Sequence, residues 1–115
     1  MKIKPSINKR VNKAVSDCRK CLIEATIELL RQIGADHGDD VLFKKMLILY
    51  QQKKDGTTET IVCDRIAYCA SNLEYPYLMV SMGAEGDVPY HSSHFMSISN
   101  LEIIYNEVRR VVREY

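Results

Sequence analysis

The densest group of side chains that could do chemistry lies between residues 85 and 94. It contains Glu85, Asp87, Tyr90, His91, Ser92, Ser93 and His94. A histidine and an acid could activate a serine, or the two histidines could hold a metal ion together with Asp87. Each role requires these groups to converge, yet His91 and His94 are three residues apart and would lie on opposite faces of an extended strand. The chain also has no phosphate-binding glycine loop, nucleophile elbow or paired metal motif. We therefore expect no catalysis, no metal and no cofactor.

Four cysteines offer a second possible metal site. Cys18 and Cys21 have the C-x-x-C spacing, but Cys63 and Cys69 are too far apart to complete a zinc motif. Cys18 and Cys21 also fall in a segment with helical periodicity, where a three-residue step places them on adjoining faces of a helix. We expect all four to be reduced and largely buried thiols in a cytoplasmic protein.

Length and composition favour one domain covering residues 1–115. The chain has 115 residues, of which 46% are hydrophobic, which is enough for one packed core. Sixteen lysines and arginines oppose fifteen acids, so the formal net charge is +1 and no global field favours nucleic acid or acidic lipid. No apolar run approaches the length of a membrane span. Any affinity for a partner must therefore come from a local surface.

A long helix is predicted from Ser6 to Ile33. Its apolar residues recur at steps of three and four: Ile7, Val11, Val15, Cys18, Leu22, Ala25, Leu29 and Ile33. Ser6 suits the N-cap, and Gly34 can take the left-handed conformation that ends a helix. Additional apolar residues in the second half indicate cover on more than one side. The first half has a narrower seam, suited to core packing or to a partner helix.

A β-hairpin is predicted next, with strands over Val41–Gln52 and from Thr57 onward. Asp55-Gly56 between two runs of β-forming residues is a strong turn signal. A two-residue turn there would place Ile48 opposite Cys63 and Leu49 opposite Val62, on opposite faces of the sheet. Both faces would then be apolar near the base of the hairpin.

The later strands are shorter. Alternation slips at Asp64-Arg65, so we expect one strand to end near Cys63 and another to cover Arg65–Ala70. A compact apolar strand follows over Tyr77–Met82, with a weaker one within Tyr90–Met96.

The chain ends with an amphipathic helix, and one side of it is lined at steps of three and four by Leu101, Ile104, Val108, Val111 and Tyr115. Its start is indicated by Ser99 and Glu102, which have the spacing of a capping box. The expected fold is α+β: a long N-terminal helix, an antiparallel sheet of about four to five strands, and this C-terminal helix packed on the sheet.

The second half of the chain resembles the phosphotyrosine-binding domains, which have a pleckstrin-homology-like (PH/PTB-like) fold. The resemblance is carried by Asp64-Arg65-Ile66-Ala67-Tyr68-Cys69-Ala70, by Tyr77-Leu78-Met79-Val80-Ser81-Met82, by His94-Phe95-Met96 and by the terminal amphipathic helix. The predicted long helix also resembles the first helix of that family, but more loosely. The resemblance implies a non-enzymatic, adaptor-type domain.

Such domains bind peptides of the Asn-Pro-x-Tyr type as an added strand beside the C-terminal helix. Carried over by position, the resemblance implies that the peptide-binding residues are Tyr77, Leu78, Met79, Val80, Ser81, Met82, Ile104, Val108, Val111 and Tyr115. Core packing is the other role open to the helix residues and to Tyr115. The expected edge strand has no arginine or lysine to bind a phosphate, so we expect binding that does not depend on phosphorylation.

Two other functions stay open. In one, the helix seam at Val11, Val15, Cys18 and Leu22 closes a homodimer together with the apolar sheet faces. In the other, the helix–strands–helix order and the basic N-terminus serve nucleic acid. The closing helix begins Ser-Asn-Leu-Glu without a lysine cluster, so nucleic acid is not the expected partner.

Overall fold

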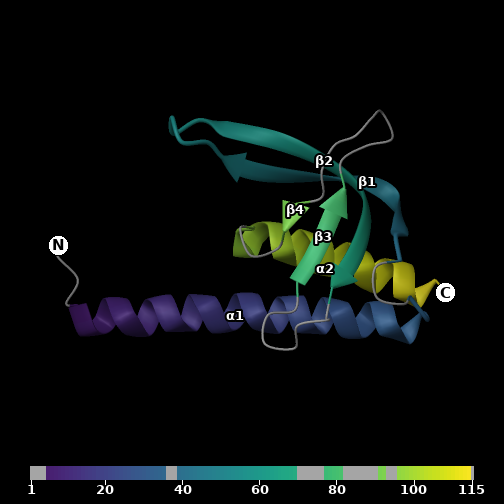
Figure 1. The fold of residues 1–115 in the computed structure, drawn as a ribbon, viewed down its shortest axis with the longest axis horizontal. Coiled ribbons are helices and arrows are strands. Elements are labelled where there is room, and N and C mark those ends of the chain that lie inside the picture. Colours follow the sequence, from purple (N-terminus) through teal and green to yellow (C-terminus); the bar gives the residue numbers. More distant parts are fainter. Residues whose placement is uncertain (1–4, 36–38, 70–76, 82–90, 93–95, 115) are drawn as a thin grey trace.

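The computed structural model describes residues 5–35, 39–69, 77–81, 91–92 and 96–114. Its elements follow in the order α1 (Pro5–Gln32), β1 (Val41–Gln52), β2 (Thr58–Cys69), β3 (Tyr77–Ser81), β4 (His91–Ser92) and α2 (Ile98–Arg113). The architecture is α+β, with an N-terminal helix, an antiparallel sheet and a C-terminal helix packed on the sheet. Helix α1 runs along the longest axis of the molecule, and α2 lies beside it beneath the sheet (Figure 1).

Helix α1 begins and ends one residue earlier than the sequence predicts, and the predicted glycine closes it. Gly34 has φ of 76°, and the amides of Gly34 and Ala35 bond the carbonyls of Arg31 and Leu30. This left-handed glycine closes the last turn, as expected. Pro5 is already helical, so the predicted N-cap at Ser6 is wrong. Proline suits the first helical position because its fixed φ matches the helix and its missing N–H is not needed there.

The two halves of α1 differ in burial, as predicted. In the second half, Ile23, Ile27 and Leu30 are buried in the core. Thr26 is buried between them and donates its hydroxyl to the Leu22 carbonyl, 2.7 Å away. Between residues 10 and 21 every side chain that the structure describes is exposed, apart from Arg19, which is half-buried.

The sheet has the strand order β1-β2-β3-β4, and all neighbouring pairs are antiparallel. The hairpin between β1 and β2 forms where predicted, but its register differs by one residue. Ile48 pairs with Val62, and Leu49 pairs with Ile61.

The hairpin loop explains the register. The Lys53 amide bonds the Thr57 carbonyl at 2.7 Å, the Gly56 amide bonds the Lys53 carbonyl at 3.0 Å, and Gly56 has φ of 89°. This is the pattern of a three-residue loop whose last residue is left-handed, not of a two-residue turn. Because side chains alternate, the shift of one residue moves Leu49 and Ile61 onto the buried face and Ile48 and Val62 onto the outer one.

The irregularity predicted at Asp64-Arg65 is present, although it does not split the strand. β2 is continuous, and the register against β1 changes between Leu42, opposite Arg65, and Leu47, opposite Cys63. The extra residues therefore belong to β1. Buried Cys63 and buried Ile66 reach the core from the two sides of this bulge.

Helix α2 begins two residues before the predicted capping box. Ser97, with extended φ and ψ of −67° and 158°, is the N-cap, and its side chain accepts a hydrogen bond from the Asn100 amide. The prediction of a cap at Ser99 is wrong, whereas the predicted apolar side of the helix is confirmed. Leu101, Ile104, Val108 and Val111 are buried in one cluster with α1 and the sheet. Tyr115 lies outside the described residues.

Candidate functional site

Strand β3, the expected peptide-binding edge, lies inside the sheet. It pairs with β2 along its whole length, from Cys69–Tyr77 to Arg65–Ser81. On its other side Met79 pairs with Ser92, and Val80 pairs with His91 of β4. The expectation that β3 has a free edge is therefore wrong at Met79 and Val80, because the weak segment after residue 90 supplies a further strand.

The expected binding residues of β3 divide by burial. Leu78 and Val80 are fully buried, while Tyr77 and Met79 are half-buried. Ser81 belongs to the strand, but its side chain is outside the described part of the structure, as is all of Met82.

The expected binding residues of α2 are core residues. Ile104, Val108 and Val111 have relative exposures of 0%, 1% and 4%, and they share one cluster with Leu78 and Val80. The structure thus brings the two predicted groups together, but as packed core rather than as a groove wall. Among the strands, β1 makes the main contact with α2.

Tyr77 has one notable electrostatic feature. It is paired with Cys69 on β2. A hydrogen bond between the Tyr77 and Cys69 side chains, together with the negative charge of the Cys69 thiolate, raises the Tyr77 pKa above its ordinary value. A tyrosine with its ordinary pKa of about 10 is already neutral at physiological pH, so this shift does not change the charge of Tyr77 there.

The reactive cluster of residues 85–94 lies almost entirely outside the described residues. Only the backbones of His91 and Ser92 are described, as β4. In the parts of the chain that the structure covers, no three histidine, cysteine or acidic side chains converge as a metal site would require.

The cysteines divide into two pairs. Cys63 is buried and Cys69 is half-buried, whereas Cys18 and Cys21 are exposed, and none of the four forms a disulfide. The prediction of largely buried thiols is therefore wrong for the first pair, because none of the elements that the structure describes covers the N-terminal half of α1.

An exposed apolar surface lies on one of the two hairpin faces that the sequence predicts to be apolar. We call it the outer hairpin face; its members are Met46, Ile48, Tyr50 and Val62. Ile48 and Val62 are directly paired and have exposures of 52% and 39%. The signal was present in Lys53-Lys54-Asp55-Gly56, which fits a three-residue loop as well as a two-residue turn.

The open edge of β1 is bound by the first turn of α2. The side chain of Asn100 accepts a hydrogen bond from the Tyr50 amide at 3.1 Å and donates one to the Tyr50 carbonyl at 2.7 Å. Asn100 is only 5% exposed. One amide side chain thereby satisfies the two backbone groups that a further strand would otherwise pair.

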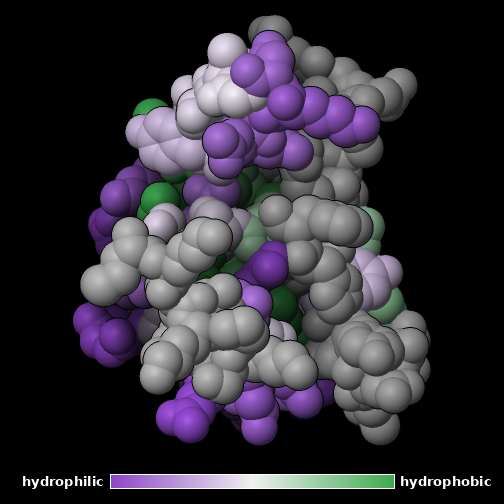
Figure 2. All heavy atoms as spheres, turned by 90° about the vertical axis from the view of Figure 1, so that its left-hand side faces the viewer, coloured by the Kyte–Doolittle hydropathy of each residue, from purple (hydrophilic) through white to green (hydrophobic). Residues whose placement is uncertain are grey.

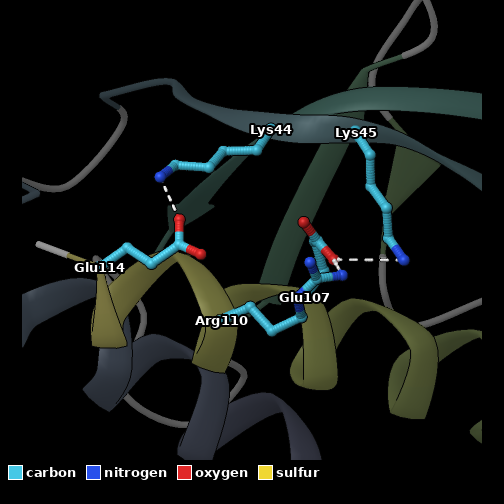
Figure 3. A network of polar contacts seen from close by, with 5 residues as sticks. All are labelled: Lys44, Lys45, Glu107, Arg110 and Glu114. Atoms are coloured by element: carbon cyan, nitrogen blue, oxygen red, sulfur yellow. Dashed lines mark hydrogen bonds and ion pairs between the residues drawn. The ribbon is translucent and has the colours of Figure 1, made fainter.

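Ion pairs join the other end of β1 to α2 (Figure 3). Lys44 contacts Glu114, and both the charge and the hydrogen bond of Lys44 lower the Glu114 pKa. Glu107, whose side chain is 3% exposed, lies 3.9 Å from the Lys45 Nζ and 3.4 Å from the Arg110 Nη1. Both ends of β1 are therefore joined to α2.

The second exposed surface is the N-terminal part of α1. This part projects beyond α2 at the same end of the molecule as the hairpin tip (Figure 1). Seen from that end, the described residues of the hairpin tip and of the helix are mainly hydrophilic, and hydrophobic residues show deeper between them (Figure 2). Among these mainly hydrophilic residues of α1, Val15 is 43% exposed and Cys18 is also exposed.

Comparison of the chain with models of protein families, with curated proteins and with solved structures gave no match. No helix in the described part of the chain is long and apolar enough to cross a membrane.

Proposed function

We propose that the protein is a non-catalytic module that associates with a second copy of itself inside the cell. The observation that carries the proposal is the exposure of apolar side chains at two places, the outer hairpin face and the N-terminal half of α1. Contiguous exposed apolar surface marks interaction sites in soluble proteins. The exposed free thiols of Cys18 and Cys21 suit a reducing compartment.

The fold supports association through faces rather than through strand edges. β3 is paired on both sides, and Asn100 occupies the edge of β1 at Tyr50. A near-neutral formal charge of +1 also places little repulsion between two copies.

Sedimentation velocity over a concentration series tests this proposal. We expect a monomer–dimer equilibrium that shifts toward monomer when a charge is placed on the surface that closes the dimer. Ile48→Glu tests the outer hairpin face, and Val15→Glu tests the N-terminal half of α1. Gln51→Glu, on the opposite face of the same hairpin, and Ser16→Glu on the same helix are the matched controls, because both residues are polar and exposed. A strict monomer at all concentrations would exclude self-association.

Peptide binding of the phosphotyrosine-binding-domain type is a second proposal, in which the α+β fold is a PH/PTB-like one. It is supported by the position of the described part of β4, where Ser92 and His91 pair with Met79 and Val80 at the edge of the sheet. An extended peptide that replaced these two residues would form the same kind of backbone hydrogen bonds with β3.

Titration with matched phosphorylated and unphosphorylated Asn-Pro-x-Tyr peptides tests this second proposal, with the amide signals of β3 as the readout. We expect equal affinity for both forms, because β3 has no arginine or lysine. A large preference for the phosphorylated peptide, or no binding of either, would contradict it.

A further inference from the structure

Helix α1 carries a second apolar stripe beside the one that it buries. The buried stripe consists of Ile23, Thr26, Ile27 and Leu30. The second stripe consists of Val15, Cys18, Leu22, Ala25 and Leu29, at steps of three, four, three and four. At about 100° per residue the two stripes are centred roughly 110° apart on the helix. Steps of this kind are those of a coiled-coil seam.

The second stripe is exposed in its first half and partly covered in its second. Val15 and Cys18 are exposed, whereas Leu22, Ala25 and Leu29 are half-buried, with the two leucines packed against the edge of the core. The stripe therefore continues from the projecting part of α1 onto the body of the protein, and it is not completely buried in either part.

The stripes of two copies match each other when the two α1 helices run antiparallel and a two-fold axis passes near Lys20. Val15 then lies opposite Ala25 of the second copy, and Cys18 lies opposite Leu22 of the second copy. Each exposed residue of one helix meets a half-buried residue of the other. A two-fold axis generates both contacts twice, as an isologous dimer requires.

The distribution of charge favours the antiparallel arrangement over the parallel one. Residues 1–20 hold seven of the sixteen basic residues and one of the fifteen acidic residues, so their formal charge is +6 and that of residues 21–115 is −5. A parallel pair would bring two basic segments together. An antiparallel pair places each basic segment on the acidic remainder of the other copy.

One specific ion pair follows from the same register. Arg10 and Glu28 are both exposed and are eighteen residues apart, which is about five helical turns, so they lie on the same side of α1. Their midpoint is next to Lys20, so Arg10 of each copy comes level with Glu28 of the other. Glu28 at present contacts Arg31 at 3.8 Å, an exposed pair that can be exchanged.

We propose that a second copy of the chain binds along this stripe as an antiparallel α1–α1 pair centred near Lys20. The inference rests on the proposed self-association and names its surface, register and direction. The outer hairpin face is not needed for it.

Distances between spin labels test the direction and the register. In a variant that carries Cys18→Ala and Cys21→Ala, one spin label is attached either at Lys20→Cys or at Lys13→Cys. Both positions lie on the side of α1 opposite the stripe. The axial separation between equivalent labels is close to zero at position 20 and about 21 Å at position 13, at 1.5 Å per residue in each helix. We expect the longer distance at position 13. Equal distances at both positions in a dimer would overturn the antiparallel pair while leaving self-association intact.

A charge exchange tests the ion pair. Arg10→Glu and Glu28→Arg should each raise the dimer dissociation constant roughly threefold to tenfold, and the double variant should restore it. Lys13→Glu makes the same charge change on the side facing away and should have a smaller effect. A dimer in which the double variant is no tighter than the single ones would overturn the register. A chain that is monomeric throughout would overturn both this inference and the proposed function.

Discussion

Asn100 joins two elements through neutral hydrogen bonds alone. Its side chain replaces a neighbouring strand for Tyr50, and its own amide is held by the Ser97 cap. The sequence could not predict this role, because a buried asparagine in the first turn of a helix looks the same as an exposed one. Its partner is fifty residues away and is known only once β1 and α2 are placed.

We expect Asn100→Ala to lower the free energy of unfolding by about 1–3 kcal/mol, because it leaves the Tyr50 amide and carbonyl without partners. Urea denaturation measures the change. Asn106→Ala removes an exposed asparagine of the same helix and should change stability far less. Equal effects of the two substitutions would contradict the role given to Asn100.

Asp55 organises the tip of the hairpin. Its carboxylate accepts hydrogen bonds from the Thr57 hydroxyl at 2.6 Å and from the Thr57 amide at 2.9 Å, and these bonds lower the Asp55 pKa below 3.8. A lowered folded-state pKa contributes stability above the unfolded-state value, and that stability is lost as the pH falls through the folded-state value.

Thr57→Val should raise the Asp55 pKa toward 3.8, since it removes the hydroxyl that lowers it most. An NMR titration of the Asp55 carboxyl carbon below pH 5 measures this shift. Thr58→Val, a change at the neighbouring exposed threonine, should leave the Asp55 pKa where it is. An Asp55 pKa that is the same in all three proteins would show that the hydroxyl bond has no effect.

At the scale of the elements, the sequence predicts most of what forms. The helical spacing of α1, the bounds of β1 and the apolar side of α2 are confirmed, because local periodicity determines each of them. The hairpin register was not predictable in the same way. The choice between a two-residue and a three-residue loop depends on whether Gly56 is the second or the third loop residue, and both fit the same letters.

Gly56 should therefore be sensitive to substitution. We expect Gly56→Ala to cost about 1–2 kcal/mol, because its φ of 89° is unfavourable for a residue with a Cβ atom. Beyond Gly56 itself and its two chain neighbours, no heavy atom lies within 4 Å of the position that a Cβ would occupy, so contacts with the rest of the molecule would not add to this cost. Gly56→Asn should cost less, since asparagine tolerates the left-handed region. Thermal unfolding measures both, and an alanine variant as stable as the parent would contradict the loop assignment.

At the scale of the whole molecule, the core and the candidate surfaces occupy different parts of the chain. The buried cluster begins at Ile23 and includes residues of both helices and three strands. Several residues of this cluster were predicted to bind peptide, because the resemblance to phosphotyrosine-binding domains implies a strand at the sheet edge and an exposed groove beside the C-terminal helix. Those properties depend on which strands become neighbours, and the pairing of β3 with β4 is not encoded in the β3 segment itself.

Removal of residues 1–16 should leave a cooperatively folding protein, because none of the side chains that the structure describes in this segment, those of Arg10 and residues 12–16, belongs to the buried cluster. For the full chain we expect the urea midpoint to rise with protein concentration, as it does when association stabilises the folded state. For the truncated chain the midpoint should not change with concentration. Ile23→Ala in the full chain is the contrasting variant and should cost about 2–5 kcal/mol. Loss of cooperative unfolding on truncation would show that the N-terminal segment belongs to the core after all.

The length of α1 also affects how the molecule rotates in solution. Twenty-eight helical residues measure about 42 Å, and the longest dimension of the molecule, along which α1 lies, is 48 Å (Figure 1). The peptide N–H bonds of a helix are parallel to its axis, so those of α1 point along the long axis of the molecule. They are reoriented only by end-over-end tumbling, which is the slowest rotation of an elongated body. The amides of α1 should therefore relax as if they belonged to a larger protein than the amides of the strands that cross them.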